Sequence, residues 1–253
     1  MADFVNRPFV VLVVTFFLLW FVAWIGGRFG LRQDDSSESV RQDFGVIQSA
    51  TLTLLGLIIG FTFSMAIGRY DQRKLYEEAE ANAIGTEYVR ADLLPPDEAS
   101  KVRELLRKYT DLRVRFYVTR DLDELNQINL QTTQTQNQLW AAVSQTATEP
   151  TPIRALAVAG MNDVLNSQGY TQAAWWNRIP VGAWCLMFGI AVLANLLVGY
   201  GAHKVRVKLF MMFPLAVAIS FFLIADIDSP RRGVIRVRPQ NMESLQAGFN
   251  ALQ

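Results

Sequence analysis

The sequence contains very few of the side chains that usually carry catalysis or bind metals. Its 253 residues include one cysteine, Cys185, and one histidine, His203. A single cysteine cannot form an intrachain disulfide, and a single histidine excludes a cluster of histidine ligands and argues against a Ser-His-Asp triad. No lysine-containing phosphate loop, and no G-x-G-x-x-G after a strand, is found. We therefore expect no catalytic residue, no metal and no cofactor, and we predict that the protein is not an enzyme.

A strong excess of charge is also missing. The 24 lysine and arginine residues nearly balance the 23 aspartate and glutamate residues, which leaves a formal net charge of +1. Such a chain has no overall positive field with which to attract nucleic acid, so we expect no nucleic-acid partner. Patterns typical of β-strands are nearly absent, and the polar regions have helical periodicity, which predicts an all-α fold.

Long apolar runs are abundant, in contrast. Hydrophobic residues make up 51% of the chain, and the mean hydropathy is +0.17. A helix needs roughly 20 apolar residues to cross the hydrocarbon core of a bilayer. Four segments of about that length predict four transmembrane helices, at residues 9–27, 46–68, 181–201 and 207–225.

The first apolar segment could also be a signal peptide, because Arg7 precedes it near the start of the sequence. Its apolar stretch is longer than a secretory hydrophobic region, it carries Trp20 and Trp24, and it has no small-residue cleavage site. These features favour a helix that is retained in the membrane.

Ionisable side chains are absent from the interiors of the four predicted spans. Transporters that work by alternating access usually carry such a residue near the middle of the membrane, so its absence argues against this class. The polar side chains within the spans are neutral, and most of them lie on the second span: Gln48, Ser49, Thr51, Thr53, Thr62 and Ser64.

The second span is predicted to continue as a helix beyond the membrane. No proline or turn cluster interrupts residues 46–94, and Pro95 and Pro96 then stop the helix. Such a helix would be about 70 Å long. A further helix with one buried face is predicted to begin at Asp97. Another is predicted to begin at Asp121, whose spacing to Glu124 resembles a capping box. Thr151 and Pro152 predict a third, as its N-cap and first helical residue. The predicted buried face of the helix from Asp97 consists of Val102, Leu105, Leu106, Tyr109, Leu112 and Phe116.

Several polar and aromatic groups in residues 69–179 have simple structural interpretations. The acidic cluster Glu77, Glu78 and Glu80 is predicted to be a solvated face that pairs with Arg73 and Lys74. The polar run at residues 129–138 is either a solvated face or the lining of an aqueous vestibule. Two tryptophans and an arginine before the third span indicate an anchor at the membrane interface, namely Trp175, Trp176 and Arg178.

The fourth span contains Pro214, which predicts a kink, and it ends at Asp226 and Asp228. These carboxylates either mark the membrane surface and pair with Arg231 and Arg232, or form a ring of charge that sorts ions in an oligomer. The following residues 236–253 predict a short amphipathic helix that lies on the domain or on the membrane. Its apolar side chains are Met242, Leu245, Phe249 and Leu252.

Small residues recur at every fourth position of the second span, at Gly56, Gly60, Ser64 and Gly68. Such spacing lets another helix approach closely. Two interpretations are open: tight packing within one four-helix bundle, or packing of several copies around an axis, with a path that Phe61 or Phe63 narrows. The candidate pore-lining residues are Thr53, Gly56, Gly60, Phe61, Thr62, Phe63 and Ser64. The candidate charges at the pore mouth are Arg69, Arg73, Asp226 and Asp228.

Five segments together resemble the bacterial family of bestrophin-like domain proteins. They are GFTFSMAIGRYDQRK (60–74), EANAIGTEYVRADLLP (80–95), NRIP (177–180), GYGAHK (199–204) and DIDSPRRGVIRVRPQ (226–240), and the second is the most specific. The resemblance extends distantly to bestrophin channels. It implies four spans, cytoplasmic termini, a helical cytoplasmic domain, and a homopentamer whose pore is lined by the second span, with Phe61 as the candidate neck. The acidic run with which bestrophins bind calcium is absent here.

We therefore predict an all-α, polytopic protein of the bacterial inner membrane, with a helical domain inserted between its second and third transmembrane helices. Basic residues near the spans favour cytoplasmic termini and a cytoplasmic domain by nine to six, whereas the short basic loop at residues 203–208 argues for the opposite orientation. The predicted parts are residues 1–68, 69–179, 180–226 and 227–253. The expected function is a homo-oligomeric ion channel whose permeant ion the sequence does not specify. The alternatives are a non-conducting sensor or scaffold that binds a cytosolic partner and, least favoured, a membrane enzyme.

Overall fold

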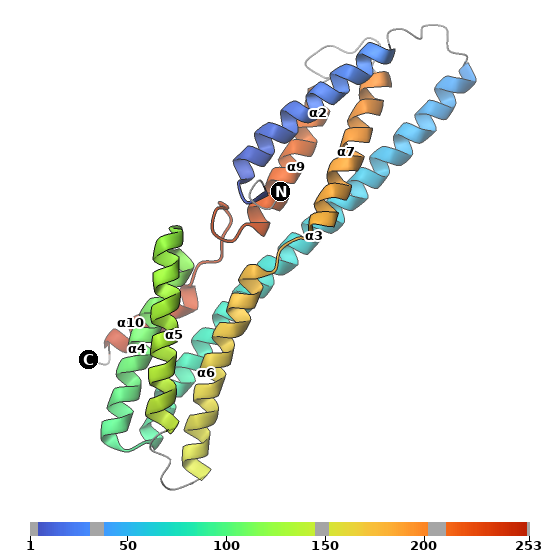
Figure 1. Cartoon of the computed structure of the whole chain (residues 1–253). Coiled ribbons are helices and arrows are strands. Elements are labelled where there is room, and N and C mark those ends of the chain that lie inside the picture. Colours follow the sequence, from blue (N-terminus) through green and yellow to red (C-terminus); the bar gives the residue numbers. More distant parts are fainter. Residues whose placement is uncertain (1–4, 31–37, 145–151, 202–210, 252–253) are drawn as a thin grey trace. The chain divides into compact units, whose positions relative to one another are not determined.

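All regular secondary structure in the described part of the chain is helical. The computed structural model describes residues 5–30, 38–144, 152–201 and 211–251. Its helices are α2 (Pro8–Gly30), α3 (Glu38–Arg90), the 3₁₀ turn η1 (Ala91–Leu93), α4 (Pro96–Val118), α5 (Leu122–Ser144), α6 (Pro152–Trp176), α7 (Val181–Gly201), α9 (Met212–Asp228) and α10 (Gln240–Ala251) (Figure 1). The predicted all-α fold class is confirmed.

The chain divides into two compact units. The first comprises Met1–Tyr70 and Arg178–Arg236, and the second comprises Asp71–Asn177 and Val237–Gln253. Helix α3 belongs to both units, because it runs without a break for 53 residues, a length of about 80 Å. The 3₁₀ turn η1 and then Pro95 end it. The prediction of one continuous helix that stops at the two prolines is therefore confirmed.

In the first unit, α2 packs directly against α7 and α9 (Figure 1). A side chain at Gly199 would collide with the carbonyl group of Ala23, and one at Gly26 would collide with that of Leu196. The backbones of α2 and α7 are therefore in direct contact at this level, as small residues permit in membrane helices.

Three helical stretches of the described chain are long and apolar enough to cross a membrane: Pro8–Phe29, Ser39–Leu93 and Arg154–Gly201. They contain the first three predicted spans, and the third predicted span has the same bounds as α7. The apolar helix α9 has 17 residues, and residues 207–210 of the predicted fourth span lie outside the described residues. The count of four spans stays a prediction.

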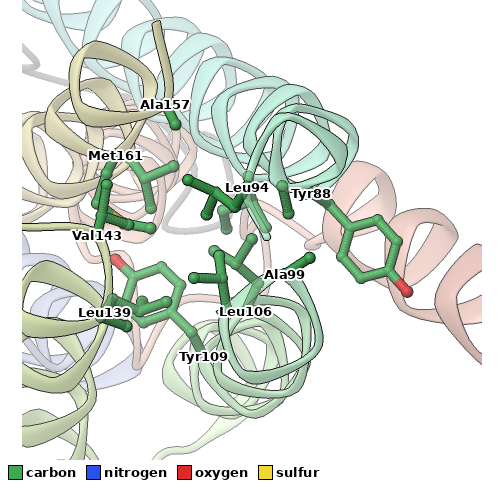
Figure 2. Packing of buried hydrophobic residues seen from close by; sticks show 14 of the residues in the cluster. Tyr88, Leu94, Ala99, Leu106, Tyr109, Leu139, Val143, Ala157 and Met161 are labelled. Atoms are coloured by element: carbon green, nitrogen blue, oxygen red, sulfur yellow. The ribbon is translucent and has the colours of Figure 1, made fainter. Parts of the chain in front are cut away.

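In the second unit, the C-terminal part of α3 shares one apolar core with α4, α5, α6 and α10. Figure 2 shows Leu106, Tyr109, Leu139 and Met161 converging in the core of this unit. The predicted apolar face of α4 is buried, except that Leu105 is half-buried. Helix α10 packs on this unit through its two buried apolar residues, Met242 and Phe249. The domain, one of the two predicted surfaces for this helix, is therefore where it lies. Leu252 lies outside the described residues.

The prediction of a solvated acidic face on α3 is wrong for two of its three glutamates. Glu77 is 1% exposed and caps the N-terminus of α10, because its Oε1 accepts hydrogen bonds from the backbone N–H groups of Asn241 and Met242, both at 3.0 Å. Its other oxygen accepts a hydrogen bond from the Asn241 side chain at 2.7 Å. Backbone donors and the positive end of the α10 dipole thereby stabilise the buried carboxylate. Of the cluster, Glu78 alone is exposed.

Glu80 is the acceptor at the centre of a second buried polar group. Its carboxylate accepts hydrogen bonds from Nε and Nη2 of Arg113 at 2.5 and 3.2 Å, and neither side chain is exposed. Thr171 of α6 donates a third bond at 2.9 Å. The pKa of Tyr117, whose hydroxyl also contacts Glu80, is raised by burial and by this carboxylate. These bonds connect α3, α4 and α6 across sequence separations of 33 and 91 residues.

Two smaller predictions also differ from the structure. Trp175 is buried against Phe116 and Tyr117, at ring distances of 5.0 and 5.5 Å, so it is a core residue rather than an interfacial anchor. Pro214 lies in the first turn of α9, where a proline is compatible with a helix, and not at a kink within it.

Only the Asp121 half of the predicted capping box forms at the start of α5. Asp121 accepts hydrogen bonds from the N–H groups of Asp123 and Glu124. The Glu124 carboxylate instead accepts hydrogen bonds from Thr119 and Arg115, and these bonds lower its pKa. Thr151, the predicted N-cap of the next helix, lies outside the described residues.

We predict that Arg113→Met destabilises the full-length protein by about 3–5 kcal/mol, because it leaves the Glu80 carboxylate buried without its cation. Arg115→Met is the matched control on the same helix. Arg115 pairs with Glu124 at the surface, where an ion pair contributes about 0–1 kcal/mol. Chemical unfolding of the detergent-solubilised chain, followed by circular dichroism, measures both effects. Equal losses in the two variants would contradict the importance of the buried pair.

Candidate pore helix

The membrane segment of α3, residues 46–68, buries one side against its own chain. Leu55, Thr62 and Ala66 are 2%, 4% and 0% exposed, and Leu55 and Ala66 belong to the apolar core of the first unit. At about 3.6 residues per turn, these three positions lie on one side of the helix. The remaining circumference of the segment is largely open.

The small residues lie on the open side. A side chain built at Gly56, Gly60 or Gly68 would meet nothing within 4 Å, and Ser64 is exposed. Tight packing within one bundle, the first of the two sequence-based interpretations, therefore does not account for this stripe in the described chain. The α2–α7 contact at Gly26 and Gly199 shows what close packing looks like in the same unit.

The predicted pore-lining residues divide between the two sides of the helix. Thr53, Gly56, Gly60, Phe61, Phe63 and Ser64 are exposed, with 66% for Phe61 and 36% for Phe63. Thr62 is buried, and its hydroxyl donates a hydrogen bond to the carbonyl oxygen of Ile58 at 2.8 Å. Thr62 therefore faces the core of its own chain. Its spacing of seven residues from Leu55 could have revealed this, since such positions share a face.

The candidate charges of the pore mouth are less exposed than the open stripe. Arg69 is half-buried, and Arg73 is 1% exposed. Asp226 is 1% exposed, and its carboxylate accepts hydrogen bonds from the backbone N–H groups of Val234 and Ile235 at 2.7 and 2.8 Å. Asp226 therefore holds the loop after α9 in place, a structural role that the sequence pattern did not indicate.

Asp228 has a comparable structural environment. It is 2% exposed, and both of its carboxylate oxygens accept the N–H group of Ile179, at 3.2 and 3.3 Å. Arg178 donates a hydrogen bond to the Asp228 carbonyl oxygen, and burial lowers the pKa of this arginine. A cavity of about 110 Å³ beside these residues is lined mainly by apolar side chains, including Ile179 and Trp184, and has room for water molecules.

No group of three or more His, Cys, Asp or Glu side chains in the described residues is placed to hold a metal ion. Cys185 is exposed on α7, and His203 lies outside the described residues. What the first unit presents is an apolar helix with an open stripe of glycines and hydroxyl groups.

Comparison with known proteins places this arrangement in a family. The sequence profile of the bestrophin-like domain matches residues 13–242. A search of curated proteins found no match.

Solved structures share the fold over nearly the whole chain. A point variant of a bacterial bestrophin homolog from Klebsiella pneumoniae has a TM-score of 0.67 at 10% identity, over 97% of this chain and 98% of that chain. A zinc-phased structure of a bestrophin homolog from the same organism has a TM-score of 0.64 at 11% identity, over 97% and 98%. A structure described as a membrane protein has a TM-score of 0.62 at 11% identity, over 96% of both chains. These likenesses show a common all-α fold.

The sequence profile covers about nine tenths of the chain, and the segments that it spans include α3 with its open stripe. The chain belongs to the bestrophin-like domain family.

Proposed function

We propose that the protein is a homo-oligomeric ion channel in which the open side of α3, residues 53–64, lines the ion path. One observation carries the proposal: the glycines and hydroxyl groups of this apolar helix face away from the rest of their own chain. In a monomer this stripe would lie against lipid, where its hydroxyl groups would find no water with which to form hydrogen bonds. If several copies of α3 packed around an axis, the small residues of the stripe would let neighbouring copies approach closely. The hydroxyl groups of the stripe would line the ion path.

The proposed path has no fixed charge between Thr53 and Ser64. Hydroxyl groups and backbone dipoles would then solvate the ion, and a ring of Phe61 side chains would form an apolar constriction, which can close by losing its water. Phe61 is 66% exposed, so it is free to face such an axis. Thr62, Asp226 and Asp228 have structural roles in this proposal, because they are buried in their own chain.

Membership in the family supports the same proposal. The structures with the same fold include bacterial bestrophin homologs, and bestrophins are the channels that the sequence resembles. By this resemblance we propose five subunits, a location in the bacterial inner membrane, and cytoplasmic termini and helical domain. The domain boundaries predicted from sequence belong to this proposal.

A second candidate is a non-conducting scaffold. A groove of about 750 Å³ between α3 and α10 in the second unit favours it, with Tyr88, Asn241, Leu245 and Phe249 among its lining residues. A partner segment could bind there without any ion conduction. Purified protein that passes no current in planar bilayers but retains a defined partner through this groove would favour the scaffold over the channel.

Cysteine accessibility tests which side of α3 faces the path. In a Cys185→Ser background, which removes the exposed native thiol, we predict that a charged, water-soluble thiol reagent blocks most of the current through Ser64→Cys and Phe61→Cys channels. Thr62→Cys is the matched control, because Thr62 is buried between these exposed neighbours. Block of Thr62→Cys alone would place the path on the other side of the helix.

Gly60→Leu tests assembly separately from conduction. The new side chain meets nothing within its own chain, so we expect the protomer to fold normally. It would fill the close contact between copies of α3, and we therefore expect native mass spectrometry to show dissociated subunits. Gly189→Leu on α7 is the control, since that position is equally open within the chain. An intact oligomer in the Gly60→Leu variant would defeat the proposed contact.

A further inference from the structure

The second unit contains a carboxyl group whose environment differs from that of every other carboxylate described above. Glu87 of α3 is 0% exposed, and neither of its oxygens has a hydrogen-bond partner within the described residues. Glu77 and Glu80, which precede it on the same helix, are equally buried but accept three or more hydrogen bonds each. Burial without hydrogen bonds disfavours the charged form of an acid.

A glycine on the neighbouring helix makes room for this carboxyl group. A side chain at Gly160 of α6 would collide with Oε2 of Glu87 and with the guanidinium group of Arg90. The carboxyl group therefore lies directly against the backbone of α6. Ala157 and Met161, which flank Gly160 on α6, belong to the apolar core of this unit (Figure 2), so the surroundings of this contact are largely apolar.

Two charged groups act on the Glu87 carboxyl group, one from each helix. Arg90 follows it on α3 and lowers its pKa, whereas Asp163 of α6 raises it. Desolvation is the largest influence, and the resulting pKa is about 8, compared with an ordinary value of 4.5. The attraction to Arg90 is thus too weak to offset burial, and the acid form is favoured at neutral pH.

We propose that Glu87 is a proton-binding site of the helical unit, and that loss of its proton loosens the contact between α3 and α6 at Gly160. The protonated group is neutral and tolerates its apolar surroundings. The deprotonated group is a buried anion beside Asp163, and it gains solvation only if the two helices separate. The site would make the packing of this unit respond to pH near neutrality, independently of whether the protein conducts ions.

The direction of the pH dependence follows from proton binding. Below about pH 4.5 the group is protonated in the folded and unfolded chain alike, so it causes no pH dependence. Between about pH 4.5 and about pH 8 the folded chain holds one more proton than the unfolded chain. Within this window the ratio of folded to unfolded protein therefore falls, by up to about tenfold, for each unit by which the pH rises. Above about pH 8 this contribution is constant.

Unfolding of the detergent-solubilised full chain as a function of pH tests the proposal. We expect Glu87→Gln, which keeps the shape and removes the charge, to abolish the loss of stability between about pH 4.5 and about pH 8. Glu78→Gln, on the exposed side of the same helix, should retain the wild-type profile. Identical profiles for wild type and Glu87→Gln would overturn the proposal.

Infrared difference spectroscopy supplies a signature that a merely structural role would not produce. We expect wild type and Glu78→Gln at neutral pH to show the carbonyl stretch of a protonated acid, and Glu87→Gln to lack it. Gly160→Ala should also lose this band, because it displaces Glu87 towards solvent. Hydrogen exchange around Gly160 should become faster in wild type than in Glu87→Gln above about pH 8. If the wild type lacked the band of the protonated acid, Glu87 would not be a proton-binding site. If wild type and Glu87→Gln exchanged at equal rates, loss of the proton would not loosen the contact.

Discussion

The unbroken backbone of helix α3 is the constraint on which the rest of the structure depends. One helix from Glu38 to Arg90 supplies an apolar segment with an open stripe of small residues, and later a buried row of charged residues. The apolar segment needs no polar partners from other helices, because its backbone hydrogen bonds are internal. The charged row needs several, and the sequences of α4, α6 and α10 provide them through Arg113, Thr171 and Asn241.

The buried charges also specify how the second unit is assembled. An apolar core tolerates small shifts between helices, whereas the Glu80 carboxylate is stabilised only when Arg113 and Thr171 reach it in the correct geometry. Loss of Arg113 would leave the Glu80 carboxylate buried without its cation, at a cost of about 3–5 kcal/mol. The surface ion pair between Arg115 and Glu124 has no comparable effect on the packing of helices.

Most of the fold could be predicted from the sequence, because apolar run length and helical period are local properties. The bounds of α7, the stop of α3 before Pro95 and the buried face of α4 all followed from them. The roles of Glu77, Glu80 and Trp175 could not be predicted, because their partners are distant in the chain; Glu77 and Asn241 are 164 residues apart. The small-residue stripe of the candidate site was visible in the sequence. The side on which it lies was not, since the same spacing serves contacts within a chain and between chains.

The cap that Glu77 places on α10 has a consequence for biosynthesis. The three hydrogen-bond donors that satisfy this carboxylate come from Asn241 and Met242, near the end of the sequence, whereas Glu77 itself is made early. Before α10 has been made, the Glu77 carboxylate lacks all three of these donors, and its charged form is stable only where water can reach it. The native environment of Glu77 is therefore complete only after translation of α10.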